Sequence, residues 1–300
     1  MSMDISVVIP SYNTQDTIAA TLANLSEQQT ALQYEIVLVD CSAHDEIQQI
    51  ASGFPKVRYE HRAQRFNPGE GRNIGAQLAQ GELLMFIDAD VHLAPDALNA
   101  AWNALRSGKD VFGGALELNT KVSSDTAAYL EHYFFNHESQ ALRPACERSN
   151  LSSALMCFRR ETFLAAGGFK DIPRMQDTEL TERLRQRGQK LFFCPDIVGL
   201  QIQDSPFKKV LKKIYINGQN LYYIRYQPEI TPLKKIGFYV LLPAIGAIKI
   251  ARIIGRHLVY QSWQNKLRTL ALSPALVLGI TYWTAGFYNA LWTEKGISKE

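Results

Sequence analysis

The chain has 300 residues, which suffices for one large α/β domain with an appendage or for two small domains. Hydrophobic residues make up 46% of it and charged residues 20%, as in a globular protein with an ordinary core. The formal net charge of +3 is too small to indicate a nucleic-acid partner, and we expect none.

Short apolar runs alternate with helical patterns from the beginning of the chain. Residues 5–10 are apolar and β-branched and end at a proline, and residues 35–40 form a second run of this kind. Both predict buried strands. Between them, Asn13 or Thr14 can cap a helix whose apolar residues share one face.

Three more elements follow. Residues 57–62 alternate in polarity and predict an edge strand, residues 71–80 predict a helix, and residues 83–88 predict another buried strand. Strands of four to eight apolar residues separated by helices indicate a mostly parallel sheet that helices cover on both faces. We therefore predict an α/β fold for this part of the chain.

The last third of the chain is basic and hydrophobic. Its lysines and arginines suggest an anionic surface, such as a membrane face or a diphosphate. The apolar run 236–248 is too short to cross a bilayer, so we expect it to be interfacial or re-entrant. The stretch 270–292 holds no charge, ends before Glu294 and Lys295, and is long enough to cross. Helices packed on the rest of the protein are the alternative.

The cysteines and the N-terminus bear on location. The four cysteines are too far apart in sequence for a C-x-x-C metal site, and the N-terminal residues do not resemble a targeting segment. We interpret the cysteines as reduced thiols of a cytosolic protein. With the hydrophobic end, this predicts the cytoplasmic face of a membrane, with peripheral attachment or anchoring through the C-terminal region.

Polar residues follow three of the predicted strands, where ligands bind in sheets of this kind. They are Ser11 to Asn13, Asp40, and the pair Asp88 and Asp90. Two carboxylates at i and i+2 can face one divalent cation across a tight turn, and Mg²⁺ or Mn²⁺ prefers such oxygens. Such a cation can stabilise a departing nucleoside diphosphate. His92 could add a ligand, although a surface-loop histidine is the more ordinary interpretation.

Six segments, in order, resemble the motifs of the family 2 glycosyltransferases, inverting enzymes with the GT-A fold. The resemblance covers roughly residues 4–200. It implies a nucleotide-binding GT-A sheet flanked by helices in a domain of residues 1–205. Residues 206–300 are then a helical, membrane-associating appendage. The segments are Ser6–Asn13, Glu35–Ser42, Gly71–Gly75, Gly81–Asp90, Phe158–Phe169 and Gln176–Leu180 with Arg183.

The resemblance implies a donor site for a UDP- or GDP-sugar. Pro10, Tyr12 and Asp40 would hold the nucleoside base, with Asp40 accepting a hydrogen bond from its ring imide. Arg72 and Asn73 would lie near the base and the diphosphate.

The resemblance also implies a metal site and a base. Asp88 would contact the ribose, and Asp90 would bind Mn²⁺ or Mg²⁺ with Asp88 beside it. Asp177 would be the general base that deprotonates a hydroxyl of a glycan or lipid-linked acceptor, from the face opposite the leaving diphosphate. Without the resemblance, Asp177 is a helix-start carboxylate, and Glu179 is a substitute candidate for the base.

Three departures from the family pattern qualify this assignment. Gln176 stands where the family commonly has a glutamate, which removes a negative neighbour of Asp177. Gln201 and Gln203 stand where the family often has a metal-binding histidine. The Q-x-x-R-W motif of processive members is absent, and Tyr222–Tyr226 stands in its place, which favours transfer of a single sugar.

Other interpretations are weaker. A sugar nucleotidyltransferase would carry a glycine-rich basic loop where residues 10–14 stand, and a non-catalytic protein of the same fold is supported only by the departures. The glycines of residues 69–75 resemble a dinucleotide loop but do not follow the first strand. The aromatic helix around residues 129–135 is expected to pack on the sheet, with a sugar-stacking wall as the alternative.

Overall fold

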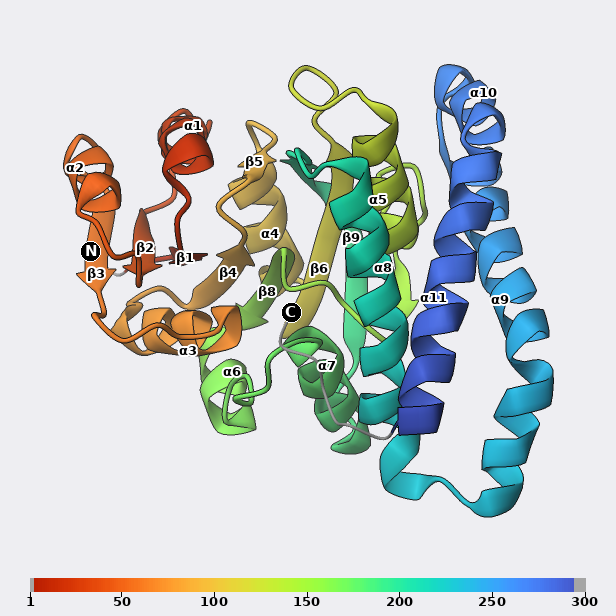
Figure 1. Ribbon diagram of the computed structural model, residues 1–300. Helices are drawn as coiled ribbons and strands as arrows, with labels where there is room; N and C mark the ends of the chain where they lie inside the picture. The colour runs from red at the N-terminus through yellow and green to blue at the C-terminus, as the bar shows by residue number, and fades with distance from the viewer. Residues whose placement is uncertain (1–2, 294–300) are drawn as a thin grey trace. The chain divides into compact units, whose positions relative to one another are not determined.

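The computed structural model describes residues 3–293, which form two compact units (Figure 1). The first unit comprises the described residues of Met1–Glu117 with Arg143–Ile172 and Gln176–Gln201. The second comprises Leu118–Leu142, Pro173–Met175 and the described residues of Ile202–Glu300. The division between residues 205 and 206 remains a prediction about domains.

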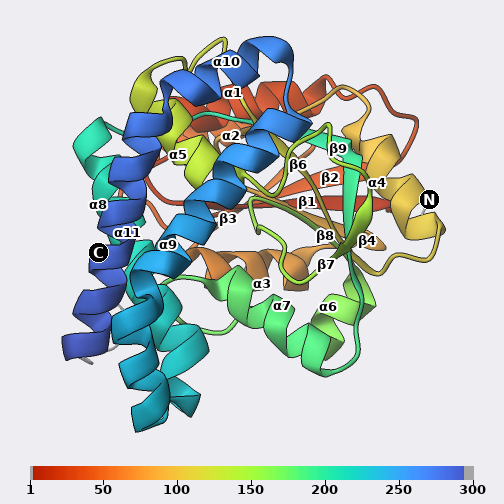
Figure 2. The same cartoon turned by 90° about the vertical axis from the view of Figure 1, so that its right-hand side faces the viewer.

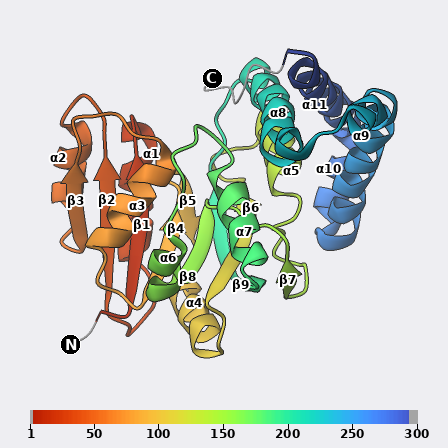
Figure 3. The ribbon, with the colours of Figure 1, turned by 90° about the horizontal axis from the view of Figure 1, so that it is seen from below.

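Nine strands form one sheet in the described part of the chain. Their order is β3-β2-β1-β4-β8-β6-β9-β5, and β7 pairs with β9. Figure 3 shows β3, β2 and β1 side by side. The strands are β1 Ile5–Ser11, β2 Tyr34–Asp40, β3 Val57–His61, β4 Leu83–Ile87, β5 Val91–Leu93, β6 Val111–Leu118, β7 Cys146–Arg148, β8 Leu155–Arg159 and β9 Leu191–Gln201.

Only one half of this sheet is parallel. β1 pairs in parallel with β2 and β4, and β2 pairs in parallel with the edge strand β3. The pairs β4–β8, β6–β8, β5–β9 and β7–β9 are antiparallel. The α/β fold is confirmed, but the expectation of a mostly parallel sheet is wrong for the second half. A strand buried on both faces, such as β8, has the same apolar composition in either direction.

Helices cover both faces of the sheet, as predicted. Alternate residues of β1 point to opposite sides: Val7 belongs to the core under α1, α2 and α4, and Val8 to the core over α3, α6 and α7. Figure 1 shows these two helix layers. The helices are α1 Gln15–Ser26, α2 Glu46–Ser52, α3 Pro68–Leu78, α4 Ala97–Arg106, α6 Arg160–Ala166 and α7 Gln176–Gln186.

The second unit is helical. Its elements are α5 Thr126–Asn136, α8 Phe207–Leu221 with a π-helical turn Tyr222–Tyr226, the short helix Gln227–Glu229, α9 Pro232–Tyr260, α10 Trp263–Ala271 and α11 Ser273–Thr293. The aromatic helix α5, which we expected on the sheet, buries its side chains in the core of this unit. Because α5 is apolar around most of its circumference, its sequence does not reveal its partner: Tyr133 stacks on His257 of α9 with ring centroids 3.8 Å apart.

Helix α11 is tightly packed against α8. A Cβ atom at Gly286 would lie 2.0 Å from the carbonyl oxygen of Tyr215, and one at Gly218 would lie 2.1 Å from that of Trp283. The two backbones can approach this closely only because both positions are glycine. The stretch 270–292 therefore includes a helix with one face packed inside the protein; Glu294 and Lys295, which follow it, lie outside the described residues.

Helix α9 differs from the prediction for residues 236–248. Instead of ending near residue 248, the helix continues through Lys249 and Arg252 and reaches 29 residues. By length and composition it could cross a membrane, and only 17% of its apolar window is buried. Helices α10 and α11 are long and apolar enough to cross a membrane only when they are taken together, and a bend of 60° separates them. Hydrophobicity was therefore a poor guide to which helix is packed.

Candidate functional site

Asp40 lies fully buried at the end of β2 and is held by two hydroxyl groups. Ser42 Oγ donates to Asp40 Oδ1 at 2.7 Å, and the Tyr59 hydroxyl donates to Oδ2 at 3.1 Å. Burial, and then the negative charge of Asp40, raise the pKa of Tyr59, so this phenol keeps its proton. The carboxylate is thus fixed in position at the carboxyl edge of the sheet.

The loop after β1 is tied to the same place. The Asn13 backbone N–H donates to Ser42 Oγ at 2.8 Å, and Asn13 has a left-handed φ of 52°. Tyr12 is 41% exposed, and the Arg65 guanidinium lies over its ring, 4.3 Å from the centroid. An exposed aromatic ring beside a buried carboxylate can stack on a planar base.

The start of α3 packs closely on β1. A Cβ atom at Gly71 would lie 3.1 Å from Pro10 Cβ and 2.6 Å from the ring of Phe66. Helix α3 begins at Pro68, three residues earlier than predicted, because Asn67 caps it by accepting from the Glu70 N–H at 3.0 Å. The close contact at Gly71 brings the next residue, Arg72, to the end of β4, where Asp88 lies.

Arg72 and Asp88 form an ion pair. Arg72 is only 3% exposed and its Nη2 donates to Asp88 Oδ1, while the Asp88 side chain is about one third exposed. The guanidinium also lies 5.6 Å from the ring centroid of Phe169. A buried guanidinium beside an accessible carboxylate is a fixed positive charge at the strand end, suited to a neighbouring phosphate.

Asp88 and Asp90 stand on a tight turn. The Val91 N–H donates to the Asp88 carbonyl at 3.1 Å, and Thr21 Oγ1 on α1 donates to the Ala89 carbonyl at 2.8 Å. Asp90 Oδ1 lies 3.5 Å from Gln201 Nε2 at the end of β9. Gln201, which stands where the family often has a metal-binding histidine, therefore contacts Asp90.

The structure supplies the right kind of atoms for a hard cation at this turn. Asp88 and Asp90 carry carboxylate oxygens, the ligands that Mg²⁺ and Mn²⁺ prefer, whereas Gln201 turns its amide nitrogen to Asp90. Among residues 3–293, no three or more His, Cys, Asp and Glu side chains gather to enclose a metal ion. A cation here would therefore depend on phosphate oxygens and water as well. His92 lies in strand β5 and not on a surface loop.

Asn73 has a structural partner. Its Nδ2 donates to the Phe169 carbonyl at 2.8 Å, and its Oδ1 accepts from the Phe169 N–H at 2.8 Å. Gly168, with a φ of +65°, makes room for it, since a Cβ there would lie 2.4 Å from Asn73 Oδ1. The amide thus holds the loop after α6, and contact with a donor remains a prediction for this residue.

Asp177 opens α7, and its charge interacts with those of Arg72 and Asp88, although it is distant from both in sequence. Thr178 N–H donates to its Oδ1 at 2.7 Å, and Ser153 N–H lies 3.4 Å from Oδ2. Burial raises the pKa of Asp177, and the charge of Asp88 raises it further, against the hydrogen bonds and the charge of Arg72. Asp177, Arg72 and Asp88 therefore belong to one electrostatic site.

Gln176 has a function in the fold that the sequence comparison did not reveal. Its Nε2 donates to Asn67 Oδ1, the cap of α3, and to the Ile172 carbonyl at 2.7 Å. An ionised glutamate could donate neither bond. The sequence alone indicates only the loss of a charge at Gln176; the signal that points toward its structural role is the helix-cap pattern at Asn67 and Pro68.

Glu179 is engaged elsewhere. Arg183 Nε and Lys170 Nζ each lie 2.9 Å from its Oε1. Burial alone would raise the pKa of Glu179, but these two cations bring it below its ordinary value. A carboxylate bound by two cations is a weak proton acceptor, so the geometry favours Asp177 over Glu179 as the base.

A protein family model and several curated proteins match this chain. The family model described as Glycosyl transferase family 2 matches residues 6–164, which is more than half of the chain. The poly(ribitol-phosphate) beta-glucosyltransferase of Bacillus spizizenii is 34% identical over 107 residues, 34% of this chain and 17% of that protein. The chain spans 17%, 62% and 33% of the length of three curated relatives, less than two thirds of each.

Solved structures share the fold. The Pyrobaculum calidifontis mannosyltransferase PcManGT, in complex with GDP-Man and Mn²⁺, superposes with a TM-score of 0.63 at 17% identity, covering 98% of this chain and 89% of that one. Residues 1–349 of S. aureus TarS, in complex with UDP-GlcNAc, give a TM-score of 0.55 at 17% identity, covering 96% and 92%. At these identities the likeness concerns the fold alone.

Proposed function

Because the chain belongs to glycosyl transferase family 2 and has the GT-A fold, we propose that it transfers one sugar from a UDP- or GDP-sugar to a hydroxyl acceptor with inversion. The acceptor would be a glycan, a polysaccharide precursor or a lipid-linked sugar. One observation carries the proposal: Asp177 is within electrostatic reach of Arg72 and Asp88, although about ninety residues separate it from Asp88. A base and a diphosphate site are what the reaction must bring together.

At the donor end, each side chain would have a separate task. Asp40 is held by Ser42 and Tyr59, so its free acceptor capacity would go to the ring N–H of the base. Tyr12 would stack on the base, and Pro10 would form the floor beside it. Arg72 would stabilise the diphosphate, with Asn73 behind it on the same helix.

At the metal end, Asp90 would bind Mn²⁺ or Mg²⁺ and Asp88 would contact the ribose and the cation. The cation would supply positive charge that stabilises the departing diphosphate. The turn between Asp88 and Val91 fixes the backbone that carries both carboxylates, and Arg72 holds the Asp88 side chain, which would limit reorganisation during the reaction. The mannosyltransferase solved with GDP-Man and Mn²⁺ supports a donor site and a metal of this kind.

At the acceptor end, Asp177 would take the proton. The acceptor oxygen forms a bond to the anomeric carbon while its proton passes to the Asp177 carboxylate. The bond from the anomeric carbon to the diphosphate oxygen breaks, and the nucleoside diphosphate leaves with the electron pair. Burial raises the pKa of Asp177 and so brings it closer to that of an effective base near neutral pH.

We further propose attachment to the cytoplasmic face of a membrane, peripherally or through the C-terminal region. Helix α9 supports this, because it exposes large apolar side chains such as Leu233 at 79% and Val240 at 71%, next to Lys234 and Lys235. Absence of the Q-x-x-R-W motif supports single-sugar transfer.

Initial rates of transfer from a panel of UDP- and GDP-sugars, with and without Mn²⁺, test the proposal. We expect Asp177→Asn to lower kcat about 100-fold or more with little change in the KM for the donor, as for loss of a general base. Asp90→Asn should lose the response to Mn²⁺.

Asp16→Asn, a change of an exposed carboxylate on α1, is the matched control and should leave the rate unchanged. Release of pyrophosphate from a nucleoside triphosphate and a sugar phosphate would instead show a nucleotidyltransferase. Full Mn²⁺-dependent turnover by Asp90→Asn would contradict the assignment of the metal site.

A further inference from the structure

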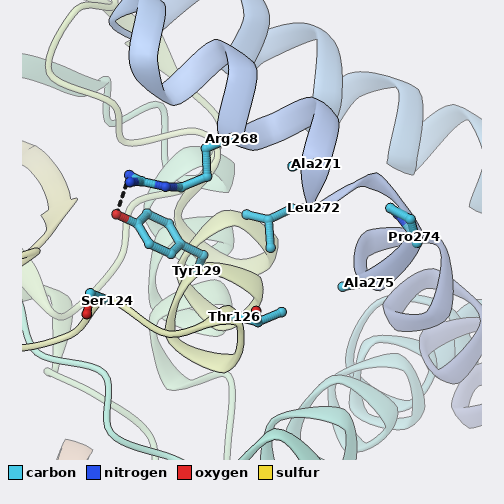
Figure 4. A pocket seen from close by; sticks show the side chains of 8 residues that line it. All are labelled: Ser124, Thr126, Tyr129, Arg268, Ala271, Leu272, Pro274 and Ala275. Atoms are coloured by element: carbon cyan, nitrogen blue, oxygen red, sulfur yellow. Dashed lines mark hydrogen bonds between the residues drawn. The ribbon is translucent and has the colours of Figure 1, made fainter.

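The second unit contains a cavity that the proposed transfer reaction does not use. Its volume is about 350 Å³, a size at which small-ligand sites begin (Figure 4). One wall carries the polar groups of Ser124, Thr126, Tyr129 and Arg268. The other wall is apolar and is formed where α10 bends into α11, between Ala271 and Ala275.

Arg268 holds the only charge among the residues that line this cavity. Its Nη1 donates to the Tyr129 hydroxyl and, at 3.0 Å, to Asn265 Oδ1, and its guanidinium lies 4.2 Å from the centroid of the Tyr129 ring. Figure 4 shows the guanidinium beside the Tyr129 hydroxyl, with Ser124 and Thr126 at separate places along the same cavity. A stacked guanidinium is already oriented, so it would lose little freedom on binding an anion.

The lining favours an anion over a neutral or cationic ligand. Arginine, tyrosine, serine and threonine all donate hydrogen bonds, and no carboxylate lines the cavity. The carboxylate of Asp125 is turned to the backbone, where it accepts from the Ala128 N–H at 2.7 Å. Because the opposite wall is apolar, the ligand is best described as an anionic group attached to an apolar body.

Helix α10 identifies where such a ligand would come from. Trp263, Leu267 and Leu270 recur at i, i+4 and i+7, so they share one face, and they are 72%, 53% and 54% exposed. An exposed stripe of tryptophan and leucine on a helix that carries Lys266 and Arg268 is typical of a helix lying in a membrane interface. Figure 2 shows α10 at the junction of α9 and α11.

The position of Arg268 around helix α10 determines how deep it would lie in a membrane interface. At roughly 100° per residue, Arg268 is turned about 140° away from Trp263 around the helix. Interfacial helices bury their apolar face roughly 5–10 Å into the boundary between headgroups and acyl chains, and a helix is about 10 Å thick. With the stripe in that boundary, the far side of α10 would stand at the level of lipid phosphates.

We propose that the Arg268 cavity binds the phosphate group of an anionic membrane lipid while α10 lies in the bilayer interface. The guanidinium and the hydroxyl groups of Tyr129, Ser124 and Thr126 bind the phosphate, and the Ala271 wall contacts the apolar part. The proposal builds on the proposed membrane attachment and is independent of sugar transfer.

Sedimentation of the full chain with vesicles tests it. We compare phosphatidylcholine vesicles with vesicles that also contain phosphatidylglycerol. Arg268→Gln removes the charge, and Ala271→Leu fills the cavity without removing a charge. We expect each to weaken binding to the phosphatidylglycerol vesicles about tenfold, as for loss of a charge-assisted hydrogen bond.

Lys209→Gln on α8 is the matched control, because it removes one exposed positive charge elsewhere in the same unit. It should weaken binding less than about threefold, as for a charge that acts only through the surface potential. Thermal unfolding of each variant checks that the fold is intact. If Arg268→Gln unfolds, Ala271→Leu still tests the cavity.

A titration with inorganic phosphate separates the two possible sources of the anion. We expect weak binding that Arg268→Gln abolishes and that phosphatidylglycerol vesicles displace. Tight binding of free phosphate that vesicles do not displace would overturn the assignment to a lipid. Equal vesicle binding by wild type, Arg268→Gln and Ala271→Leu would overturn the site itself. Transfer activity to a soluble acceptor is measured separately and would fail only if the proposed reaction were wrong.

Discussion

At the scale of single residues, the amide of Gln176 explains a departure from the family pattern. It stands beside Asp177 and donates to the cap of α3 and to the Ile172 carbonyl. The family's glutamate would place a carboxylate against two oxygen acceptors here. The side chain therefore sets where α7 begins, and with it the position of the proposed base.

Gln176→Glu tests this role. The loss of two donated hydrogen bonds costs about 1–3 kcal/mol, and the attraction of the charge to helix N-termini returns only about 0.3–1 kcal/mol, so we expect net destabilisation. A protonated glutamate can donate one bond again, so the loss should shrink as the pH falls. Urea unfolding at pH 7 and pH 5 measures both. Gln186→Glu, at an exposed position in the last turn of α7, should change stability by less than about 0.5 kcal/mol.

Equal stability of Gln176→Glu and wild type at pH 7 would show that the amide hydrogen bonds do not hold α7 in place.

At the scale of elements, two glycines fix how α8 and α11 pack. Gly286 lies against the Tyr215 carbonyl, and Gly218 against that of Trp283. Both contacts involve backbone atoms, which cannot rotate away as a side chain would. The helices must therefore separate if either glycine gains a side chain.

Gly286→Ala should destabilise the second unit by about 1–3 kcal/mol or more, because overpacking forces backbone shifts. Gly255→Ala on α9 is the matched control, since no atom lies within 4 Å of a Cβ built there. It should stabilise the protein by roughly 0.5–1 kcal/mol through helix propensity. Thermal unfolding compares the two. A rise in the melting temperature for both would refute the close packing of α8 and α11.

The core of the helical unit also contains a buried histidine. His132 on α5 is 1% exposed, and burial, with the charge of His257, lowers its pKa to about 3. Asn136 lies within hydrogen-bond distance of its Nδ1 at 3.2 Å, and Tyr133 lies beside it. The imidazole is therefore neutral in the folded protein at every pH above this value.

This gives a pH dependence with a defined sign. The unfolded chain binds a proton at His132 below about pH 6.5, whereas the folded protein does so only near pH 3. The contribution of His132 is therefore complete above pH 6.5 and falls by at most about 1.4 kcal/mol for each pH unit below it. His257, whose pKa burial lowers to about 4, adds a second loss of the same sign. Urea unfolding between pH 7 and pH 4.5 measures the slope. His132→Gln should make it less steep and leave the part that His257 contributes, and His44→Gln, at an exposed position, should leave it unchanged.

An unchanged slope in His132→Gln would assign the acid sensitivity to other groups.

At the scale of the whole molecule, the sequence predicted the first unit better than the second. The runs that became β1, β2 and β4 are apolar enough to be recognised, and their polar ends gave Asp40 and Asp88. The direction of β8 could not be read, because a strand buried on both faces lacks a directional signal. The packing of α11 on α8 depends on Gly286 and Gly218, and the contacts of each lie in the other helix.

For the candidate site, the sequence predicted individual residues but not the contacts between them. Motifs in sequence order identified Asp177, but only the fold shows that it shares an electrostatic site with Arg72 and Asp88. The contacts of Asn73 with Phe169 and of Gln176 with Asn67 join residues about a hundred positions apart. A local pattern identifies Asn67 as a helix cap, but it does not identify the distant residue that donates to it.

The side chain of Asn67 joins two helices at their first turns. Its oxygen accepts from Glu70 of α3, the helix that carries Arg72, and from Gln176 of α7, the helix that carries Asp177. One amide oxygen therefore connects the helix that carries Arg72 with the helix that carries Asp177, the proposed base. A movement of α3 that accompanied arrival of the donor would carry α7 with it. In the proposed reaction, the position of Asp177 would then follow that of Arg72 through this shared oxygen.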